Sequence, residues 1–263
     1  MMYNDSKNIL FITGAFISNS CWDEWKVFFE KKGYTTHAPA WPYKDAPAEV
    51  LRARHPDAEV ASVRLHQLVA YYEHIIRSMP RKPVLVGHSI GGLIAQLLLQ
   101  KEMATAAVAI HSVPPRGIFT FKPSFLIAGW GPLGFFTSTR KTFMMSFRQW
   151  QYGFTNGMPE AWQEKGYCWA IPESKLVVRD TVSAAATVDF HKPHAPLLLI
   201  AGSADRSIPA SLNYANYQKY TDKNSVTDYK EFEGRNHFVL GQPGWQEVAM
   251  QVMSWIENNK TEN

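Results

Sequence analysis

The sequence predicts an α/β protein built on a mostly parallel, doubly wound sheet, with an inserted helical cap. Short apolar runs alternate with stretches of helical period, the pattern of strands and helices in a parallel sheet. That alternation stops between about residues 113 and 190, where Pro, Gly and aromatic residues replace clear periodicity. A length of 263 residues with 46% hydrophobic content is enough for one large domain with an insertion.

The first third of the chain supplies two strands and two helices. Residues 8–13 are apolar with β-branched members and predict the first strand. A helical stretch over residues 22–32 ends at Gly33, and residues 34–38 form a short second strand. Three prolines then mark an exposed loop, after which apolar residues recur at helical spacing over residues 59–79.

The next runs predict the centre of the sheet. Residues 84–86 are apolar throughout, as a strand covered on both faces must be. Residues 93–99 are apolar nearly all round, as a buried central helix must be. Residues 106–110 are small and apolar and predict the strand that follows.

The last quarter of the chain returns to regular alternation. Residues 196–201 form a clear strand, and residues 226–232 a weaker one because their alternation is imperfect and rich in charge. Residues 245–256 have the spacing of an amphipathic helix. The resulting division is a core of residues 1–113 and 191–263 and a cap of residues 114–190.

A G-x-S-x-G sequence, Gly87-His88-Ser89-Ile90-Gly91, lies between the apolar strand and the apolar helix. This is the strand, sharp turn and helix of a nucleophile elbow. The two glycines leave room for strand and helix to crowd around a serine in a strained conformation, so the Ser89 hydroxyl projects beside the helix N-terminus. Free N–H groups and a partial positive charge there favour the negative oxygen that develops in acyl transfer.

A serine hydroxyl needs a histidine to take its proton and an acid to orient that histidine. Asp205 comes directly after the strand at residues 196–201, and His237 comes just after the last strand. Because parallel strands bring their carboxyl ends to one edge, we expect both side chains to meet Ser89 there. Their order along the chain is serine, acid, histidine.

The chain resembles the α/β-hydrolase superfamily in the motifs Gly87-His-Ser-Ile-Gly91, Gly202-Ser-Ala-Asp205-Arg-Ser-Ile-Pro209 and Gly234-Arg-Asn-His237. The resemblance covers about residues 8–111 and 196–256. It implies the α/β-hydrolase fold, with Ser89, Asp205 and His237 as a catalytic triad.

The resemblance also implies an oxyanion hole made of two backbone N–H groups. In the family, the loop after the first apolar strand commonly reads His-Gly, and the following residue donates one N–H. This chain has Thr13-Gly14-Ala15-Phe16 there and departs at the histidine. Ala15 or Phe16 is therefore one expected donor, and Ile90, directly after the nucleophile, is the other.

Other side chains compete for the acid and base roles. Asp228 lies within a predicted strand and is a weaker candidate for the acid role than Asp205. The rivals of His237 are His111, His191 and His194. We interpret His111, at the end of a strand, as a packed core histidine, and His88, at the variable position of the elbow, as structural.

The cap is enriched in aromatic residues, since it holds nine of the fifteen Phe and four of the nine Trp in under a third of the chain. We expect most of them in packing and three or four in contact with a ligand. The candidates for an apolar pocket are Trp130, Phe135, Phe136, Phe143, Met144, Met145, Phe147, Trp150 and Trp162. The sequence thus predicts a carboxylesterase-like serine hydrolase (EC 3.1.1) that cleaves hydrophobic esters through an acyl-enzyme, without metal or organic cofactor.

Fold and triad do not fix the substrate, so hydrolysis of a thioester, lactone, amide or carbon–carbon bond stays open. Relatives with this fold also include hydroxynitrile lyases and cofactor-independent dioxygenases. A third reading is a ligand receptor that keeps the fold with little turnover. The complete triad argues against the receptor.

The composition and the N-terminal sequence bear on nucleic-acid binding, cysteine chemistry and localisation. A formal net charge of +4 without runs of like charge does not indicate nucleic-acid binding. Cys21 and Cys168 lie far apart and match no metal or redox spacing, so we expect two reduced thiols. No secretory signal pattern or membrane span is recognised, and Gly and Pro break residues 118–136, so we expect a cytoplasmic protein with a surface lid.

Overall fold

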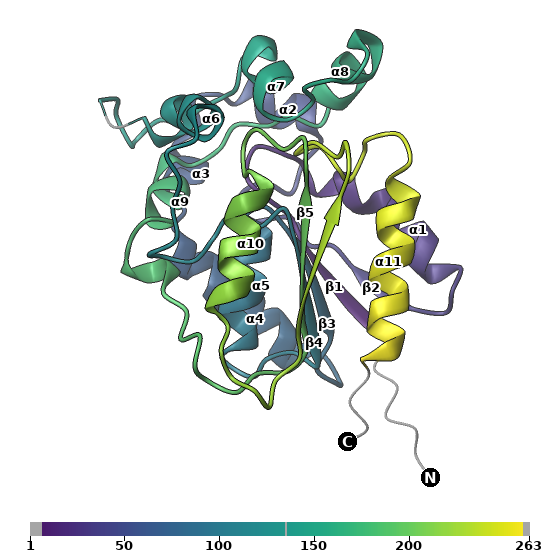
Figure 1. Cartoon of the computed structure of the whole chain (residues 1–263). Coiled ribbons are helices and arrows are strands. Elements are labelled where there is room, and N and C mark those ends of the chain that lie inside the picture. The colour runs from purple at the N-terminus through teal and green to yellow at the C-terminus, as the bar shows by residue number, and fades with distance from the viewer. Residues whose placement is uncertain (1–6, 135, 260–263) are drawn as a thin grey trace.

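The computed structural model describes residues 7–134 and 136–259, and its centre is a six-stranded sheet (Figure 1). The strands lie in the order β2-β1-β3-β4-β5-β6, and every neighbouring pair is parallel. Their bounds are β1 Asn8–Ile12, β2 Thr35–His37, β3 Val84–His88, β4 Ala106–Ile110, β5 Leu197–Gly202 and β6 Thr227–Phe232. The predicted parallel, doubly wound sheet is confirmed.

Helices cover both faces of the sheet (Figure 1). One face carries α1 (Asp23–Glu30) and α11 (Trp245–Asn258), and the other carries α4 (Leu65–Ser78), α5 (Ile90–Leu99) and α10 (Ala210–Lys219). Helix α5 follows the central strand β3 and is buried along its whole length. No helix among the described residues is long and apolar enough to cross a membrane.

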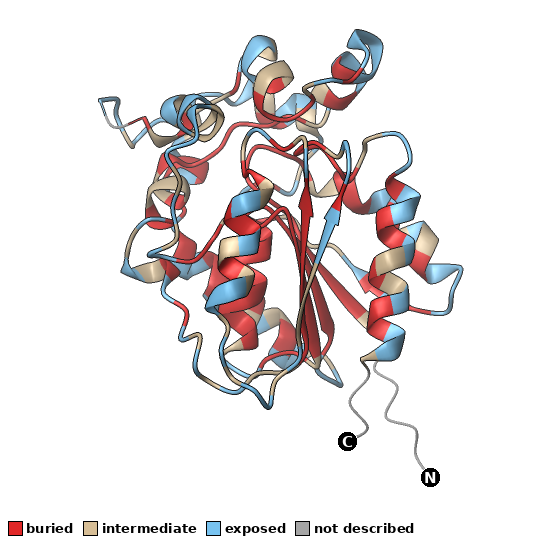
Figure 2. Cartoon of the chain, in the orientation of Figure 1, coloured by how far each residue is buried: buried red, intermediate tan, exposed pale blue. Residues whose placement is uncertain are grey.

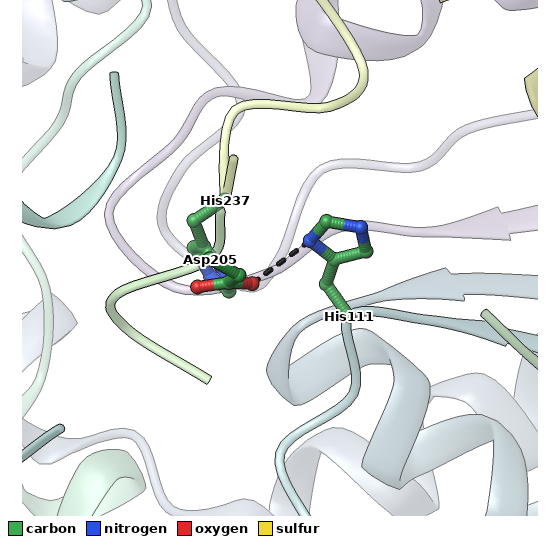
Figure 3. A group of neighbouring side chains, drawn as sticks. All are labelled: His111, Asp205 and His237. Carbon is green, nitrogen blue, oxygen red and sulfur yellow. Dashed lines mark hydrogen bonds and ion pairs between the residues drawn. The ribbon is translucent and has the colours of Figure 1, made fainter. Parts of the chain in front are cut away.

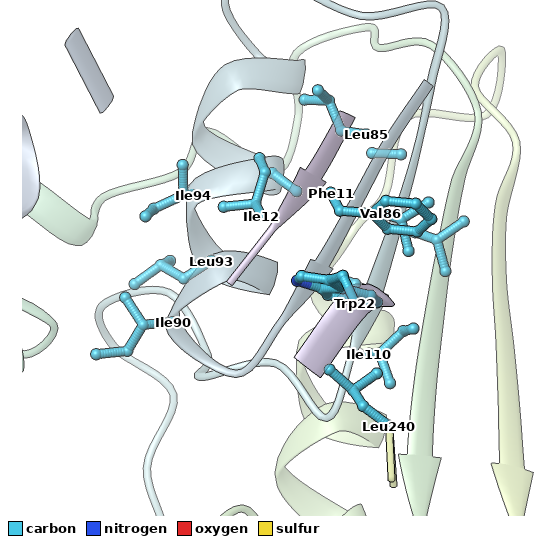
Figure 4. Packing of buried hydrophobic residues seen from close by; sticks show 14 of the residues in the cluster. Phe11, Ile12, Trp22, Leu85, Val86, Ile90, Leu93, Ile94, Ile110 and Leu240 are labelled. Carbon is cyan, nitrogen blue, oxygen red and sulfur yellow. The ribbon is translucent and has the colours of Figure 1, made fainter. Parts of the chain in front are cut away.

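Large aromatic rings pack the side of the sheet that faces α1 and α11. Phe11 of β1 stacks on Trp22 of the short 3-10 turn η1 (Asn19–Trp22), with ring centroids 4.6 Å apart (Figure 4). Trp25 of α1 stacks on Trp245 of α11 at 5.6 Å. Rings of this size bury large apolar areas, so the cluster holds both helices against the sheet.

The segment between β4 and β5 forms a helical cap over the carboxyl ends of the strands (Figure 1). Its elements are α6 Pro123–Leu133, α7 Phe147–Gly153, α8 Glu160–Tyr167, α9 Lys175–Asp180 and the 3-10 turn η2 Ala184–Ala186. An antiparallel bridge between Ile17 and Ala170 joins the cap to the loop after β1. The predicted helical insertion is confirmed.

The structure differs from the sequence-based elements between β2 and β3. The stretch predicted as a loop contains α2 (Ala48–Ala53), and the helix predicted over residues 59–79 is two helices, α3 (Ala58–Ser62) and α4. Between them the chain is extended at Val63, whose carbonyl accepts a hydrogen bond from Ser174 Oγ at 2.7 Å. A hydroxyl of the cap thus replaces a helical hydrogen bond, which helical periodicity cannot reveal.

Candidate active site

The turn between β3 and α5 holds Ser89 with a positive φ of 56° and a ψ of −119°. Glycines on both sides make this turn possible. A Cβ atom on Gly87 would lie 2.1 Å from the carbonyl oxygen of Gly91, and one on Gly91 would lie 2.1 Å from that of Ile12. Both distances are far below van der Waals contact, so only glycine fits at either position.

Ser89, His237 and Asp205 form one hydrogen-bonded chain. Nε2 of His237 lies 3.1 Å from Oγ of Ser89, and Nδ1 of His237 lies 2.7 Å from Oδ2 of Asp205. All three residues are buried. Asp205 follows β5 and His237 follows β6, so two neighbouring strands bring these side chains to the sheet edge where Ser89 stands. The distances allow a proton to pass between the serine and the imidazole.

A second histidine binds the same carboxylate (Figure 3). Nδ1 of His111 lies 2.8 Å from Oδ2 of Asp205, and the His111 side chain is fully buried. The sequence-based interpretation of His111 as a packed core histidine is right about burial but misses this bond. Its position was the available signal, because His111 directly follows β4, the strand between β3 and β5.

Asp205 is the charged member of this cluster. Burial acts to raise the pKa of Asp205, but the charge interaction with His237 and the hydrogen bonds from His111 and His237 lower it well below its usual range. The Ile208 N–H also donates to Oδ1 at 2.7 Å. Because an ionised carboxylate only accepts hydrogen bonds, both imidazoles donate from Nδ1. Nε2 of a neutral His237 is then the acceptor that faces the Ser89 hydroxyl.

Burial favours the neutral form of two further histidines. It lowers the pKa of His111, although the hydrogen bond to Asp205 acts the other way. It lowers the pKa of His88 well below the usual value, and the neighbouring His237 adds to that shift. Nε2 of His88 lies 2.9 Å from the backbone carbonyl of His237. His88 therefore contacts the backbone of the loop that carries His237.

The other candidate acid and bases make contacts elsewhere. Asp228 Oδ2 accepts a hydrogen bond from Trp255 Nε1 at 2.6 Å. Nδ1 of His191 lies 2.7 Å from Thr221 Oγ1, and Nδ1 of His194 lies 2.8 Å from the carbonyl of the next residue. None of these hydrogen bonds includes Ser89, His111, Asp205 or His237.

The backbone N–H groups near Ser89 differ in whether they already have a hydrogen-bond acceptor in the protein. Ala15, Phe16 and Ile90 all line the cavity beside Ser89. The Phe16 N–H donates to Oε2 of Glu173, a cap residue, at 3.2 Å. In the described part of the chain, the N–H groups of Ala15 and Ile90 have no protein acceptor. Ala15 and Ile90 therefore bring unpartnered N–H groups to the residues that line this cavity.

A cavity of about 160 Å³ opens beside Ser89 and His237. Its wall is mostly apolar and comes largely from the cap. The cap side chains that line it include Phe125, Leu133, Met145, Phe154 and Val178. Such a cavity suits a small apolar group placed against the Ser89 hydroxyl.

This lining corrects the expected set of pocket residues. Of the nine candidates, Phe135 lies outside the described residues, and Met145 is the one described member that lines the cavity. Trp130 and Phe136 are exposed, whereas Trp150 is buried in packing. One described member of that set therefore lines this cavity, because aromatic content does not tell which way a side chain points.

His111, Asp205 and His237 also offer donor atoms within 4.8 Å of one another, close enough to consider a metal ion. Both imidazoles direct their Nδ1 protons at Oδ2, so the lone pairs that a cation needs are not presented at a common point. The arrangement fits a proton relay that ends at Ser89.

The doubly wound sheet, the nucleophile elbow and the relay define the class of proteins to which this chain can belong. A sequence model described as the alpha/beta hydrolase family matches residues 9–249, and the chain belongs to that family. A search of curated proteins finds no match.

Solved structures share the fold over nearly the whole chain. Tomato methylketone synthase I complexed with 2-tridecanone has a TM-score of 0.70 and 16% identity, covering 97% of this chain and 100% of its own. A monoacylglycerol lipase from Paleococcus ferrophilus has 0.69 and 16%, with 96% and 94% covered. A methylesterase from Arabidopsis has 0.65 and 14%, with 95% and 98% covered. At these identities the likeness shows a common fold.

Proposed function

We propose that this protein is a serine hydrolase that cleaves hydrophobic carboxylic esters through an acyl-enzyme intermediate. One observation carries the proposal: the hydrogen-bonded chain from Asp205 through His237 to Ser89 opens onto an apolar cavity. Membership of the alpha/beta hydrolase family supports the reaction class.

Ser89 Oγ attacks the ester carbonyl carbon while Nε2 of His237 takes its proton. His237 then gives this proton to the leaving alcohol, and the acyl group stays on Ser89. A water molecule, deprotonated by His237, attacks the acyl-enzyme, and Ser89 recovers its proton as the acid leaves. Throughout, Asp205 holds the imidazole in the required tautomer and stabilises its protonated form.

The N–H groups of Ala15 and Ile90 bind the oxyanion of the tetrahedral intermediate. Ile90 is the first residue of α5, so the partial positive charge of the helix N-terminus adds to its effect. Each such donor contributes a factor of about 10² to 10³ to turnover. Phe16, the alternative donor, already gives its N–H to Glu173.

The cavity favours an uncharged substrate of modest size. The described residues that line it include no Asp, Glu, Lys or Arg. A charged acyl group would lose its hydration there without a partner. Two of the structurally similar proteins are a methylesterase and a monoacylglycerol lipase, which supports an ester as the substrate class.

Hydrolysis of p-nitrophenyl esters of increasing acyl length tests this function, with Ser89→Ala beside the wild type. We expect activity with a clear length optimum and a loss on the order of 10⁶-fold in Ser89→Ala. Ser207→Ala is the matched control, because Ser207 lines the same cavity but donates its hydroxyl to the Gly153 carbonyl. More than a tenth of wild-type activity in Ser89→Ala would overturn the assignment.

Assays with other substrates, run on the same two proteins, distinguish the other reactions that this fold supports. Turnover of acyl thioesters or lactones in preference to esters would keep the triad and change the substrate. Oxygen consumption, or cyanide release from a cyanohydrin, without ester hydrolysis would assign the site to an oxygenase or a lyase.

A further inference from the structure

A buried ion pair lies next to the oxyanion loop and outside the catalytic relay. Glu173, in the cap just before α9, is fully buried, and its carboxylate pairs with the ammonium of Lys44, which is 5% exposed. Lys44 belongs to the segment after β2 and lies over the ring of Trp41, 4.5 Å from its centroid. A buried charge that loses its partner is costly, so the two residues act as one unit.

The Glu173 carboxylate also binds backbone on both sides. Oε1 accepts the N–H of Ser174 at 2.7 Å, and Oε2 accepts the N–H of Phe16 at 3.2 Å as well as the Lys44 ammonium. Phe16 has a φ of 67°, a backbone conformation that residues other than glycine rarely adopt. Its carbonyl is also held, by the N–H of Ile171 at 3.0 Å. Both ends of the strained residue are thus fixed by the cap.

We propose that Glu173 is a positioning residue for the oxyanion hole, with Lys44 as its counter-ion. By holding the Phe16 N–H, Glu173 keeps Phe16 in the left-handed conformation and leaves the Ala15 N–H, one residue earlier, free beside Ser89. Lys44 compensates the carboxylate charge, which would otherwise oppose the negative oxygen of the intermediate. This role rests on the proposed ester hydrolysis.

The test compares kcat, KM and the rate of labelling by a fluorophosphonate probe in Glu173→Ala, Glu173→Gln and Lys44→Met. Glu173→Ala should lower kcat and the labelling rate by about 10- to 100-fold, part of what loss of a whole oxyanion donor costs, with little change in KM. Glu173→Gln keeps an oxygen for the Phe16 N–H and should recover part of the loss. Lys44→Met should lower kcat as well, because the Glu173 carboxylate then lacks its counter-ion next to the oxyanion loop.

Asp180→Asn is the matched control. Asp180 is a buried cap carboxylate that pairs with Arg64 and accepts the Leu65 N–H at 3.1 Å, away from the oxyanion loop. The Asp180→Asn variant should have a lower midpoint of thermal unfolding, as Glu173→Ala does, but its kcat should stay within threefold of the wild-type value. Equal kcat in Glu173→Ala and wild type, or equal losses in Asp180→Asn, would overturn the positioning role. A wild-type protein that neither hydrolyses esters nor reacts with the probe would overturn the proposed function too.

The outer face of the cap carries a second, independent feature. Six large apolar side chains around α6 are at least half exposed: Phe119, Phe121, Leu126, Ile127, Trp130 and Phe136. Figure 2 shows that exposed and partly exposed residues cover α6 at the rim of the molecule. Two pairs of these rings are in contact, Phe119 with Phe121 and Trp130 with Phe136. Exposed apolar side chains gathered in this way are typical of an interaction site.

The charge around this apolar face points to one kind of partner. Residues 114–159 contain Arg116, Lys122, Arg140, Lys141 and Arg148 and no Asp or Glu. All five cations are exposed. Within residues 114–159, the aromatic and aliphatic side chains are thus accompanied by cations alone, a composition that matches the surface of an anionic lipid layer.

We infer that the outer face of α6 docks on an anionic lipid surface. The opposite side of the same helix lines the cavity through Phe125, Gly129 and Leu133, so docking would bring the cavity next to the lipid. An apolar ester could then pass from the lipid layer to Ser89 with little contact with water.

Co-sedimentation of Ser89→Ala with vesicles tests the docking without turnover. We expect binding to phosphatidylcholine vesicles that contain phosphatidylglycerol, weaker binding to phosphatidylcholine alone, and at least tenfold weaker binding after Leu126→Ser and Trp130→Ser. Val27→Ser and Met250→Ser, at exposed apolar positions on α1 and α11, are the controls. No binding, equal loss in the controls, or a protein dimer that Trp130→Ser dissociates would overturn the inference.

Discussion

His111 binds Asp205 through Nδ1 and Oδ2 at 2.8 Å, and that oxygen also accepts the hydrogen bond from His237. The carboxylate is thus held by two imidazoles. A carboxylate fixed from two sides has less freedom to turn away from His237, so His111 should act on the relay without touching the substrate. Four neighbouring strands, β3 to β6, each contribute one member of the cluster at the carboxyl edge.

Loss of the His111 imidazole should lower kcat by about tenfold. His111→Asn is the suitable change, because asparagine tolerates the φ of 47° at this position but cannot reach the carboxylate in the same way. Asp205→Asn should cost about 10⁴-fold, since an amide no longer selects the right tautomer of His237. Steady-state kinetics of both variants check the ranking. An unchanged kcat in His111→Asn would show that two bonds hold Asp205 no better than one.

The buried histidines should make the protein less stable in mild acid. His88 and His111 have lowered pKa values, so each binds fewer protons in the folded chain than in the unfolded chain. The contribution of these two groups to the free energy of unfolding should therefore be complete above about pH 6.5. Below that pH the free energy of unfolding should fall, by at most about 1.4 kcal/mol per pH unit for each group.

Urea unfolding at pH 8, 6 and 5 measures this slope. His88→Gln should reduce it, because glutamine keeps an N–H for the His237 carbonyl but does not titrate. A free energy of unfolding that rises between pH 6 and 5 would contradict the assignment of neutral histidines.

The sequence predicted the sheet and the relay because both depend on short-range signals. Each of Ser89, Asp205 and His237 follows a strand within a few residues, and parallel strands bring their ends together whatever lies between them. The same rule places His111, directly after β4, at this edge, and the sequence names it as a rival of His237. Its bond to Asp205 was missed because a histidine at the end of a strand is also what core packing produces.

The sequence could not predict the parts of the site that come from the cap. Glu173 and Phe16 are 157 positions apart, and no local pattern records that a cap carboxylate binds that N–H. The cavity lining also escaped prediction, because it depends on which side of each short helix is turned inward. Trp130 and Phe125 belong to the same helix, yet Phe125 lines the cavity and Trp130 is exposed.

Gly91→Ala should destabilise the fold strongly. The added Cβ would lie 2.1 Å from the Ile12 carbonyl oxygen, so β1 and α5 would have to separate at the centre of the core. We expect a loss of roughly 3 kcal/mol or more, in the range of severe core overpacking. Gly129→Ala is the control within a helix, because its nearest atom would be 3.8 Å away, and it should be neutral or slightly stabilising. Thermal unfolding of both variants separates crowding from helix propensity.

The volume at Val178 should set the preferred acyl length. Val178 lies on α9, is partly buried and lines the cavity beside Ser89. Val178→Phe would fill part of about 160 Å³ and should move the optimum of the p-nitrophenyl ester series to shorter chains. Val178→Ala should move it to longer ones, with about a fourfold change in kcat/KM for each methylene gained or lost, the value of roughly 0.8 kcal/mol per buried CH₂. Because the two variants push in opposite directions, a general loss of activity cannot imitate the result. If both variants kept the wild-type optimum, the acyl chain would have to lie elsewhere, and this cavity would hold the alcohol.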